Sequence, residues 1–174
     1  MIQRIHVAIL LSFTLIFAPK AIAGCYDEWR QAVDEAKDNY HLPSKYCVNQ
    51  ILQYYSNQFD EATTFPIGRT VNGRIIYALR LTHPDGRMPV NERPSVLFVG
   101  SQHGSESSST RSLLDWIDHL LTKPEELIRP GSIIRNRELL EQHQIWVLPV
   151  ANLDGFGHSG DGGTRCNANA VNLN

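Results

Sequence analysis

His103 and Glu106 follow an apolar run at a spacing of three residues, and together they could bind a metal ion. The run from Ser95 to Val99 ends at Gly100, and the chain then reads Ser-Gln-His-Gly-Ser-Glu. An imidazole nitrogen and a carboxylate oxygen are both ligands that Zn²⁺ accepts. A buried strand that delivers such a pair to its carboxyl end forms half of a zinc site. The spacing alone is weak evidence, because a turn histidine followed by a glutamate at a helix N-terminus has the same pattern.

The elements around this pair predict an α/β fold. Asn72-Gly73 is a strong hairpin turn that precedes an alternating strand, and two short apolar runs read as buried strands. Strand, helix and strand in succession predict a layered domain with some parallel pairing. The expected strands are 74–82, 96–99 and 145–150, and a further element starts near Val171; the expected helices are 27–40, one that begins at Pro43–Ser44, 107–121 and 133–142.

The first 23 residues are typical of a secretory signal peptide. Arg4 is basic, an apolar segment of about a dozen residues follows, and Ala21-Ile22-Ala23 is a small-x-small cleavage signal. One alternative is an uncleaved anchor helix, although the segment is short for a membrane span. A second is a lipoprotein, because Ile22-Ala23-Gly24-Cys25 resembles a lipoprotein box. We therefore expect an exported protein that is periplasmic, secreted or anchored by a lipid on Cys25.

The three cysteines are interpreted in the light of export. An oxidising compartment permits disulfides, so Cys25 and Cys47 can pair unless Cys25 carries a lipid. Such a bridge would stabilise the fold by roughly 3 kcal/mol in the loop-entropy picture. Cys166 is then left over, and we interpret it as a small buried residue.

Length and charge bound the remaining possibilities. The chain has 174 residues and a formal net charge of −2. This length suits one domain with a sizeable core, and the charge does not suggest a nucleic-acid partner. We expect a monomer in which residues 24–60 form a helical lead-in and residues 61–174 form part of a catalytic domain.

Four motifs in order resemble the zinc carboxypeptidase family, the funnelin-type metallopeptidases. A Gly-Arg-Thr, hairpin, Gly-Arg lead-in is followed by His-x-x-Glu after a strand. Pro-x-x-Asn-x-Asp-Gly comes next, and the last motif is an Arg and an Asn with eight residues between them. The matching residues are Gly68, Arg69, Thr70, Gly73, Arg74, His103, Glu106, Pro149, Asn152, Asp154, Gly155, Arg165 and Asn174.

The resemblance implies a mixed sheet flanked by helices and roles for four of these residues. His103 and Glu106 would be the first two ligands of Zn²⁺. Arg165 would polarise the scissile carbonyl and stabilise the oxyanion, and Asn174 would help to hold the terminal carboxylate of a peptide substrate. The sequence around Arg165 is similar to that of bacterial murein peptide amidases. This similarity implies that the substrate is a cell-wall peptide with a γ-linked D-glutamate, such as γ-D-glutamyl-diaminopimelate.

Two departures from the family pattern matter. Family members usually carry Asp two residues before the binding Asn, where it accepts a hydrogen bond from the first zinc ligand. This chain has Asn172 there, which lacks the charge that raises ligand basicity. The family's third ligand and its carboxylate base lie later than Asn174. We therefore expect the fold to be truncated before its C-terminal half and this chain alone to be inactive.

Other functions need different residues. A non-catalytic cell-envelope protein could keep this half of the fold for binding. A serine hydrolase could use Gly157-His158-Ser159-Gly160, but its nucleophile motif needs glycine where this chain has Asp161. His158 is the remaining candidate for a substitute metal ligand.

Overall fold

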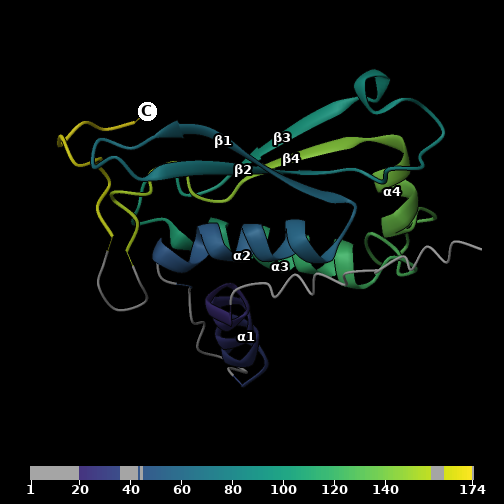
Figure 1. Ribbon diagram of the computed structural model, residues 1–174, viewed down its shortest axis with the longest axis horizontal. Coiled ribbons are helices and arrows are strands. Elements are labelled where there is room, and N and C mark those ends of the chain that lie inside the picture. The colour runs from purple at the N-terminus through teal and green to yellow at the C-terminus, as the bar shows by residue number, and fades with distance from the viewer. Residues whose placement is uncertain (1–19, 36–42, 44, 158–162, 174) are drawn as a thin grey trace, which may run out of the picture.

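The computed structural model describes residues 20–35, 43, 45–157 and 163–173. Four strands form one sheet, and the longer helices lie on one side of it (Figure 1). The helices are α1 (Lys20–Glu35), α2 (Lys45–Gln58), α3 (Ser107–Thr122), α4 (Asn136–Gln142) and the single 3-10 turn η1 (Val90–Glu92); the strands are β1 (Ala62–Arg69), β2 (Ile75–Leu81), β3 (Ser95–Val99) and β4 (Gln144–Leu148). The expected α/β class is correct.

The sheet is mixed and has the order β1-β2-β4-β3. β1 and β2 form an antiparallel hairpin whose turn contains Asn72 and Gly73, and Gly73 has a φ of 77°. β4 pairs antiparallel with β2 and parallel with β3. The parallel pair places the carboxyl ends of β3 and β4 at the same edge of the sheet.

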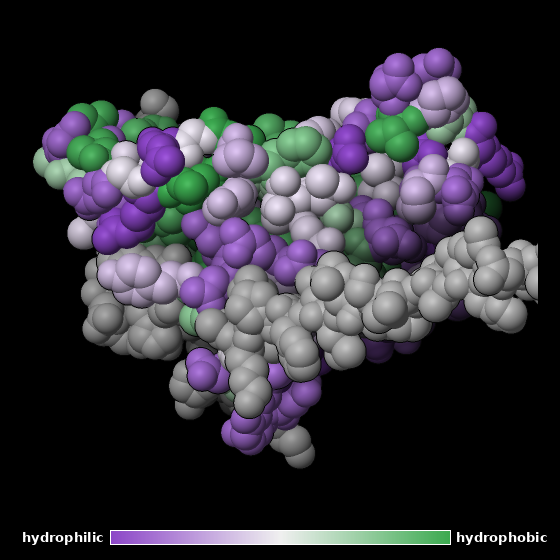
Figure 2. All heavy atoms as spheres, viewed as in Figure 1, coloured by the Kyte–Doolittle hydropathy of each residue, from purple (hydrophilic) through white to green (hydrophobic). Residues whose placement is uncertain are grey.

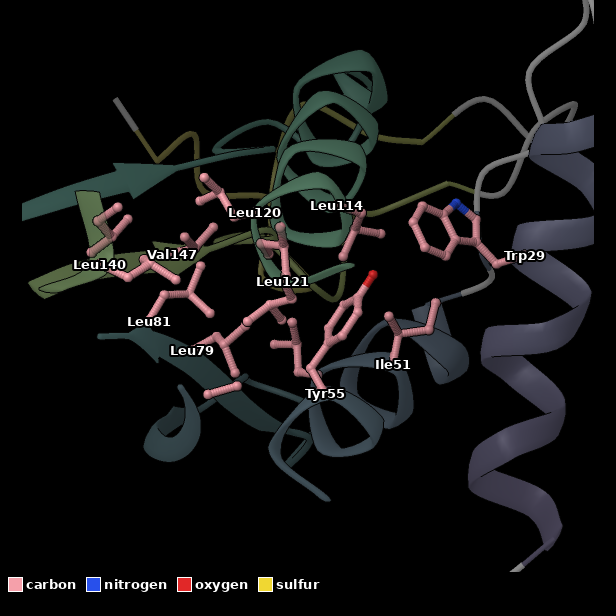
Figure 3. Packing of buried hydrophobic residues seen from close by; sticks show 14 residues of the cluster. Trp29, Ile51, Tyr55, Leu79, Leu81, Leu114, Leu120, Leu121, Leu140 and Val147 are labelled. Atoms are coloured by element: carbon pink, nitrogen blue, oxygen red, sulfur yellow. The ribbon is translucent and has the colours of Figure 1, made fainter. Parts of the chain in front are cut away.

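The core lies between the sheet and the pair α2 and α3, and α1 packs beneath these helices (Figures 1 and 3). α2 buries one stripe of its surface because its apolar residues recur every three or four positions. Figure 3 shows Trp29, Ile51 and Tyr55 facing Leu114 of α3. The fully buried residues of the predicted helical stripes are Val48, Ile51, Leu52, Tyr55, Leu114, Ile117 and Leu120.

Several element boundaries differ from expectation. α1 begins at Lys20 rather than Asp27, and the expected end at residue 40 lies outside the described residues. α4 begins at Asn136 rather than Ile133, since Glu138 accepts a hydrogen bond from the Arg135 N–H and so starts the helix there. In the described part of the chain, Val171 lies in no strand, and its neighbour Asn172 makes only an isolated bridge to Cys166.

The prediction that 96–99 is a buried strand is wrong. Every residue of β3 is exposed, with Leu97 at 61% and Val99 at 49%. The physical reason is position, because β3 is an edge strand and the described residues include no element that covers its outer side. Figure 2 shows hydrophobic residues at the surface along the side where the sheet runs. β3 is therefore an apolar, uncharged edge of the kind that promotes edge-to-edge pairing.

No helix within the described ranges combines the length and the hydropathy that crossing a membrane requires. The predicted signal segment falls largely on residues 1–19, which lie outside these ranges.

We expect Leu97→Lys to reduce self-association of the chain, because a charge on an edge strand opposes pairing with another edge. Light scattering against protein concentration measures this. Ile133→Lys is the matched control, because Ile133 is 92% exposed and lies outside the sheet. Equal scattering from the two variants would show that β3 does not drive association.

Candidate metal centre

The turn after β3 brings His103 to the sheet edge. The ladder with β4 continues past the strand ends, since Gly100 N–H donates to Leu148 O at 2.8 Å and Asn152 N–H donates to Ser101 O at 3.0 Å. A side chain at Gly100 would place its Cβ 2.5 Å from Pro149 O, so only glycine fits against this part of β4. The chain then turns sharply at Ser101, which has a φ of 40°.

Three hydroxyl groups stabilise this unusual turn. Ser109 Oγ accepts the Ser101 N–H at 2.8 Å, and Ser101 Oγ donates to Glu106 O at 3.1 Å. Thr110 Oγ1 lies 2.7 Å from Ser101 Oγ and donates to Pro149 O at 2.6 Å. These contacts join the start of α3 to the ends of β3 and β4. Sequence analysis did not identify these residues, although a serine-rich stretch at a helix start could have suggested them.

His103 and Glu106 face each other at the start of α3. His103 Nδ1 lies 2.8 Å from Glu106 Oε1, and the side chains are 9% and 54% exposed. The other ring nitrogen, Nε2, lies 3.1 Å from Asn172 Oδ1. Both ring nitrogens therefore face oxygen acceptors, and a ring that donates its Nε2–H to Asn172 would offer the Nδ1 lone pair to an ion held between Nδ1 and Glu106.

His103 Nδ1 and Glu106 Oε1 are spaced so that they could supply two of the ligands of a zinc ion. Two ligand atoms bound at about 2.1 Å to a tetrahedral ion lie about 3.4 Å apart, so Nδ1 and Oε1 would need to separate by about half an ångström. The Asn172 oxygen is placed as an orienting partner of the ring. Among the residues that the structure describes, no third His, Cys, Asp or Glu joins the group.

Arg165 and His103 both lie near the same carboxylate oxygen of Glu106, Oε1. Arg165 Nη1 is 3.8 Å from Glu106 Oε1, and the side chains of Arg165 and Glu106 are about half exposed. The buried Asn152 holds this segment, because its Nδ2 donates to Arg165 O at 3.3 Å while its Oδ1 accepts the Gly155 N–H at 3.0 Å. The predicted Asn-x-Asp-Gly motif thus places the backbone that carries Arg165.

Glycines allow the loops of the site to pack backbone against backbone. A Cβ on Gly104 would lie 2.0 Å from the Gly155 carbonyl, and one on Gly163 would lie 2.2 Å from Gly104 O. Gly157 N–H donates to Gly104 O at 3.3 Å. The approach of the Gly155 carbonyl therefore excludes a side chain at residue 104.

A tight turn brings Asn172 back to His103. Asn167 Oδ1 accepts the N–H groups of Asn169 and Val171, each at 3.0 Å. Asn167 N–H donates to Val171 O at 2.9 Å, and Ala170 takes a φ of 58°, a region that favours glycine. The Gln102 side chain donates to Leu173 O and attaches the end of the turn to the His103 loop.

The hairpin motif and Asp154 bind each other. Asp154 Oδ1 lies 2.5 Å from Arg74 Nη1, and Asp154 Oδ2 accepts the Asn72 N–H at 3.0 Å. Burial alone would raise the pKa of the Asp154 carboxyl. The hydrogen bonds from Asn72, Thr70 and Arg74 outweigh burial and hold this pKa below its usual range. The hairpin motif and Asp154 therefore stabilise the loops around the site but do not contact His103 or Glu106.

The remaining predicted residues lie elsewhere or outside the described residues. Asn174, His158 and Ser159 are not described. Two other histidines pair with carboxylates away from the candidate metal centre. His83 lies 3.7 Å from Glu61, and His119 lies 3.8 Å from Glu126.

Comparison with known proteins defines the family. The family model of the zinc carboxypeptidases matches residues 48–174. The chain therefore belongs to the zinc carboxypeptidase family, whose members are hydrolases.

Individual relatives agree and are much longer. The carboxypeptidase N catalytic chain of Homo sapiens is 31% identical over 63% of this chain and 24% of that protein, and the Rattus norvegicus chain is 32% identical over 73% and 28%. The chain thus spans about a quarter of the length of these relatives. The metallo-carboxypeptidase from Burkholderia cenocepacia superposes with a TM-score of 0.55 at 25% identity, covering 72% of this chain and 31% of that one. Carboxypeptidase A from Helicoverpa armigera shares the fold, with a TM-score of 0.51 at 19% identity over 79% and 32%.

We expect Asp154→Asn to lower the free energy of unfolding at neutral pH by about 2 kcal/mol, because a charge-assisted hydrogen bond is lost. The folded pKa of Asp154 is depressed, so the stabilisation is present above the unfolded value of about 3.9 and is lost as pH falls toward the folded value. Urea titrations at several pH values measure the difference. The exposed Asp60→Asn is the control, and a gap between wild type and Asp154→Asn that widened on acidification would contradict the assignment.

Proposed function

We propose that this chain contributes the first part of a zinc-dependent active site that hydrolyses peptide or amide bonds near a free carboxylate. The observation that carries the proposal is the arrangement at His103, with Nδ1 2.8 Å from Glu106 and Nε2 3.1 Å from Asn172. A zinc-binding histidine usually donates its second ring N–H to an oxygen acceptor, and Asn172 is placed to be that acceptor here. Membership of the zinc carboxypeptidase family supports the same metal.

Each residue of the site has a distinct task. His103 Nδ1 and Glu106 would hold the ion, and Asn172 would keep the ring in its tautomer. Zinc in such a site supplies a Lewis acid and an activated water. The Arg165 guanidinium, half exposed beside Glu106, would bind the carbonyl oxygen of the substrate and stabilise negative charge as it develops there. We further propose that Asn174 binds the substrate carboxylate. We also propose that the substrate is a cell-wall peptide with a γ-linked D-glutamate, because the sequence around Arg165 is similar to that of murein peptide amidases.

A non-catalytic binding protein is the second candidate. Asn172 in place of an aspartate favours it, because a neutral amide raises the basicity of His103 less than a carboxylate does. We accordingly propose that this chain alone does not turn over substrate.

Zinc binding tests the proposal. We expect the purified chain to bind one zinc ion through His103 and Glu106, measured by competition with a chromophoric chelator. His103→Ala should abolish this binding and His119→Ala should not. Asn172→Asp should tighten it by roughly 10- to 100-fold, because a charged partner raises ligand basicity.

Hydrolysis of γ-D-glutamyl peptides is then measured on the same zinc-loaded chain. No turnover is expected. Turnover that His103→Ala abolishes would show that the chain has a complete site. Peptide binding by a chain that binds no zinc would favour the non-catalytic alternative.

We also propose that the mature chain begins at Gly24 in an oxidising compartment outside the cytoplasm. The disulfide between Cys25 and Cys47 supports simple export, because a thiol in a disulfide cannot carry a lipid. Mass spectrometry of the exported chain should find the mass of residues 24–174 less two hydrogens for the disulfide. An intact Met1 would refute cleavage, and a lipid mass on Cys25 would refute simple export.

A further inference from the structure

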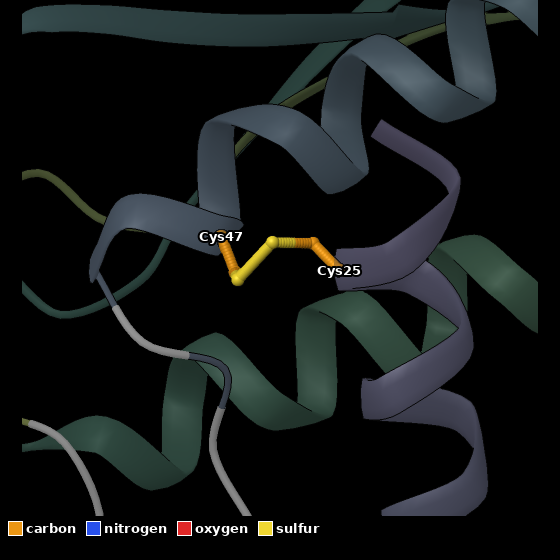
Figure 4. The surroundings of a disulfide bond; sticks show 2 residues. All are labelled: Cys25 and Cys47. Carbon is orange, nitrogen blue, oxygen red and sulfur yellow. A yellow bond between two sulfur atoms is a disulfide. The ribbon is translucent and has the colours of Figure 1, made fainter. Parts of the chain in front are cut away.

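α1 is attached to the domain in a way that the family match does not cover. The match begins at residue 48, so α1 and Cys47 precede it. The Cys25–Cys47 disulfide joins α1 to the first turn of α2 (Figure 4). Figure 4 also shows α3 running close behind the two helices.

The side chains of α1 complete the core on this side of the domain. Trp29 is only 3% exposed and belongs to the same cluster as Ile51 and Tyr55 of α2. The ring of Tyr26 stacks on Tyr54 with centroids 3.9 Å apart. Undocking α1 would expose these aromatic surfaces to water, which is unfavourable.

Asp118 of α3 is the polar anchor of α1. Its carboxylate accepts the Tyr26 hydroxyl at 2.7 Å and the Tyr55 hydroxyl at 3.2 Å, and Arg30 Nη1 lies 3.3 Å away. Burial and the nearby Asp118 raise the pKa of both tyrosines, so they remain donors. Asp118 is 7% exposed, and two of its three partners come from α1. A buried carboxylate that loses its cation and a donor is strongly destabilised.

The same helix carries Asp118 and the start of the candidate metal centre. Glu106 is the residue before α3, and Ser109 and Thr110 in its first turn hold the His103 loop. Asp118 is twelve residues after Glu106, about 18 Å along a rigid helix. A change in the packing of α3 at Asp118 can therefore alter the order of its N-terminus.

We propose that the Cys25–Cys47 disulfide is a redox latch that docks α1 and thereby orders α3 and the metal centre. A dithiol reductant transfers two electrons and two protons to the S–S bond, leaving two thiols while the reductant becomes a disulfide. The closed loop spans 22 positions, so the bridge favours the docked state on the order of 100-fold through lost chain entropy. In a reducing cytoplasm the bridge is open, so α1 undocks and α3 opens more readily than it does after export. The ordering of the metal centre rests on the proposed function, whereas the latch itself does not.

Hydrogen exchange on the zinc-free, oxidised chain tests the latch without relying on zinc. The double variant Cys25→Ser/Cys47→Ser should exchange roughly 10- to 100-fold faster than wild type in α1 and in α3, while β2 and β4 change little. Cys166→Ser, which removes the free cysteine, should match wild type. Slow exchange in α1 of the double variant would overturn the latch, and fast α1 with unchanged α3 would overturn the coupling to α3.

If the double variant exchanged equally fast in β2 and β4, it would have unfolded as a whole, and a local latch would be overturned. A second variant tests the coupling to α3 without breaking the disulfide. Arg30→Gln keeps the disulfide and removes the cation beside Asp118. It should speed exchange in α3 but leave α1 attached, and no change in α3 would overturn the coupling. If exchange behaves as expected but neither chain binds zinc, the latch stands and the proposed zinc site fails.

Discussion

Parallel pairing of β3 with β4 is the constraint on which the rest of the site depends. It brings the ends of two strands, nearly fifty residues apart in sequence, to one edge of the sheet. His103 follows the first strand and Asn152 follows the second. Because the ladder continues through Gly100 and Ser101, the two loops leave the sheet in fixed register. Everything that holds Arg165 and Asn172 near His103 is built on this register.

The loops reach bonding distance because little side-chain volume separates them. Gly104, Gly155 and Gly163 meet through their backbones, and a Cβ on any of them would collide with main-chain atoms. Asn152 and Asp154 occupy the same short loop but face different ways. The first holds the segment of Arg165, and the second holds the β1–β2 hairpin. One loop therefore joins the site to the body of the sheet.

The domain is supported from both ends of α3. At its start, hydroxyl contacts to Ser101 and Pro149 hold the helix against the strand ends. Near its end, Asp118 is bonded to α1 and α2. The outer side of β3 has no such support from the described residues, and its apolar side chains remain exposed.

The sequence by itself determined the α/β class, the hairpin at Asn72-Gly73, the helical stripes and the pairing of His103 with Glu106. These features depend on local periodicity, turn chemistry and a spacing of three residues, all of which can be read along the chain. Only the tertiary structure decided that β3 is an exposed edge, that Gly104 makes room for Gly155, and that Asn152 holds the backbone of Arg165. Burial and contact across long sequence separations depend on which strands pair and what covers them, and a linear pattern does not encode that information.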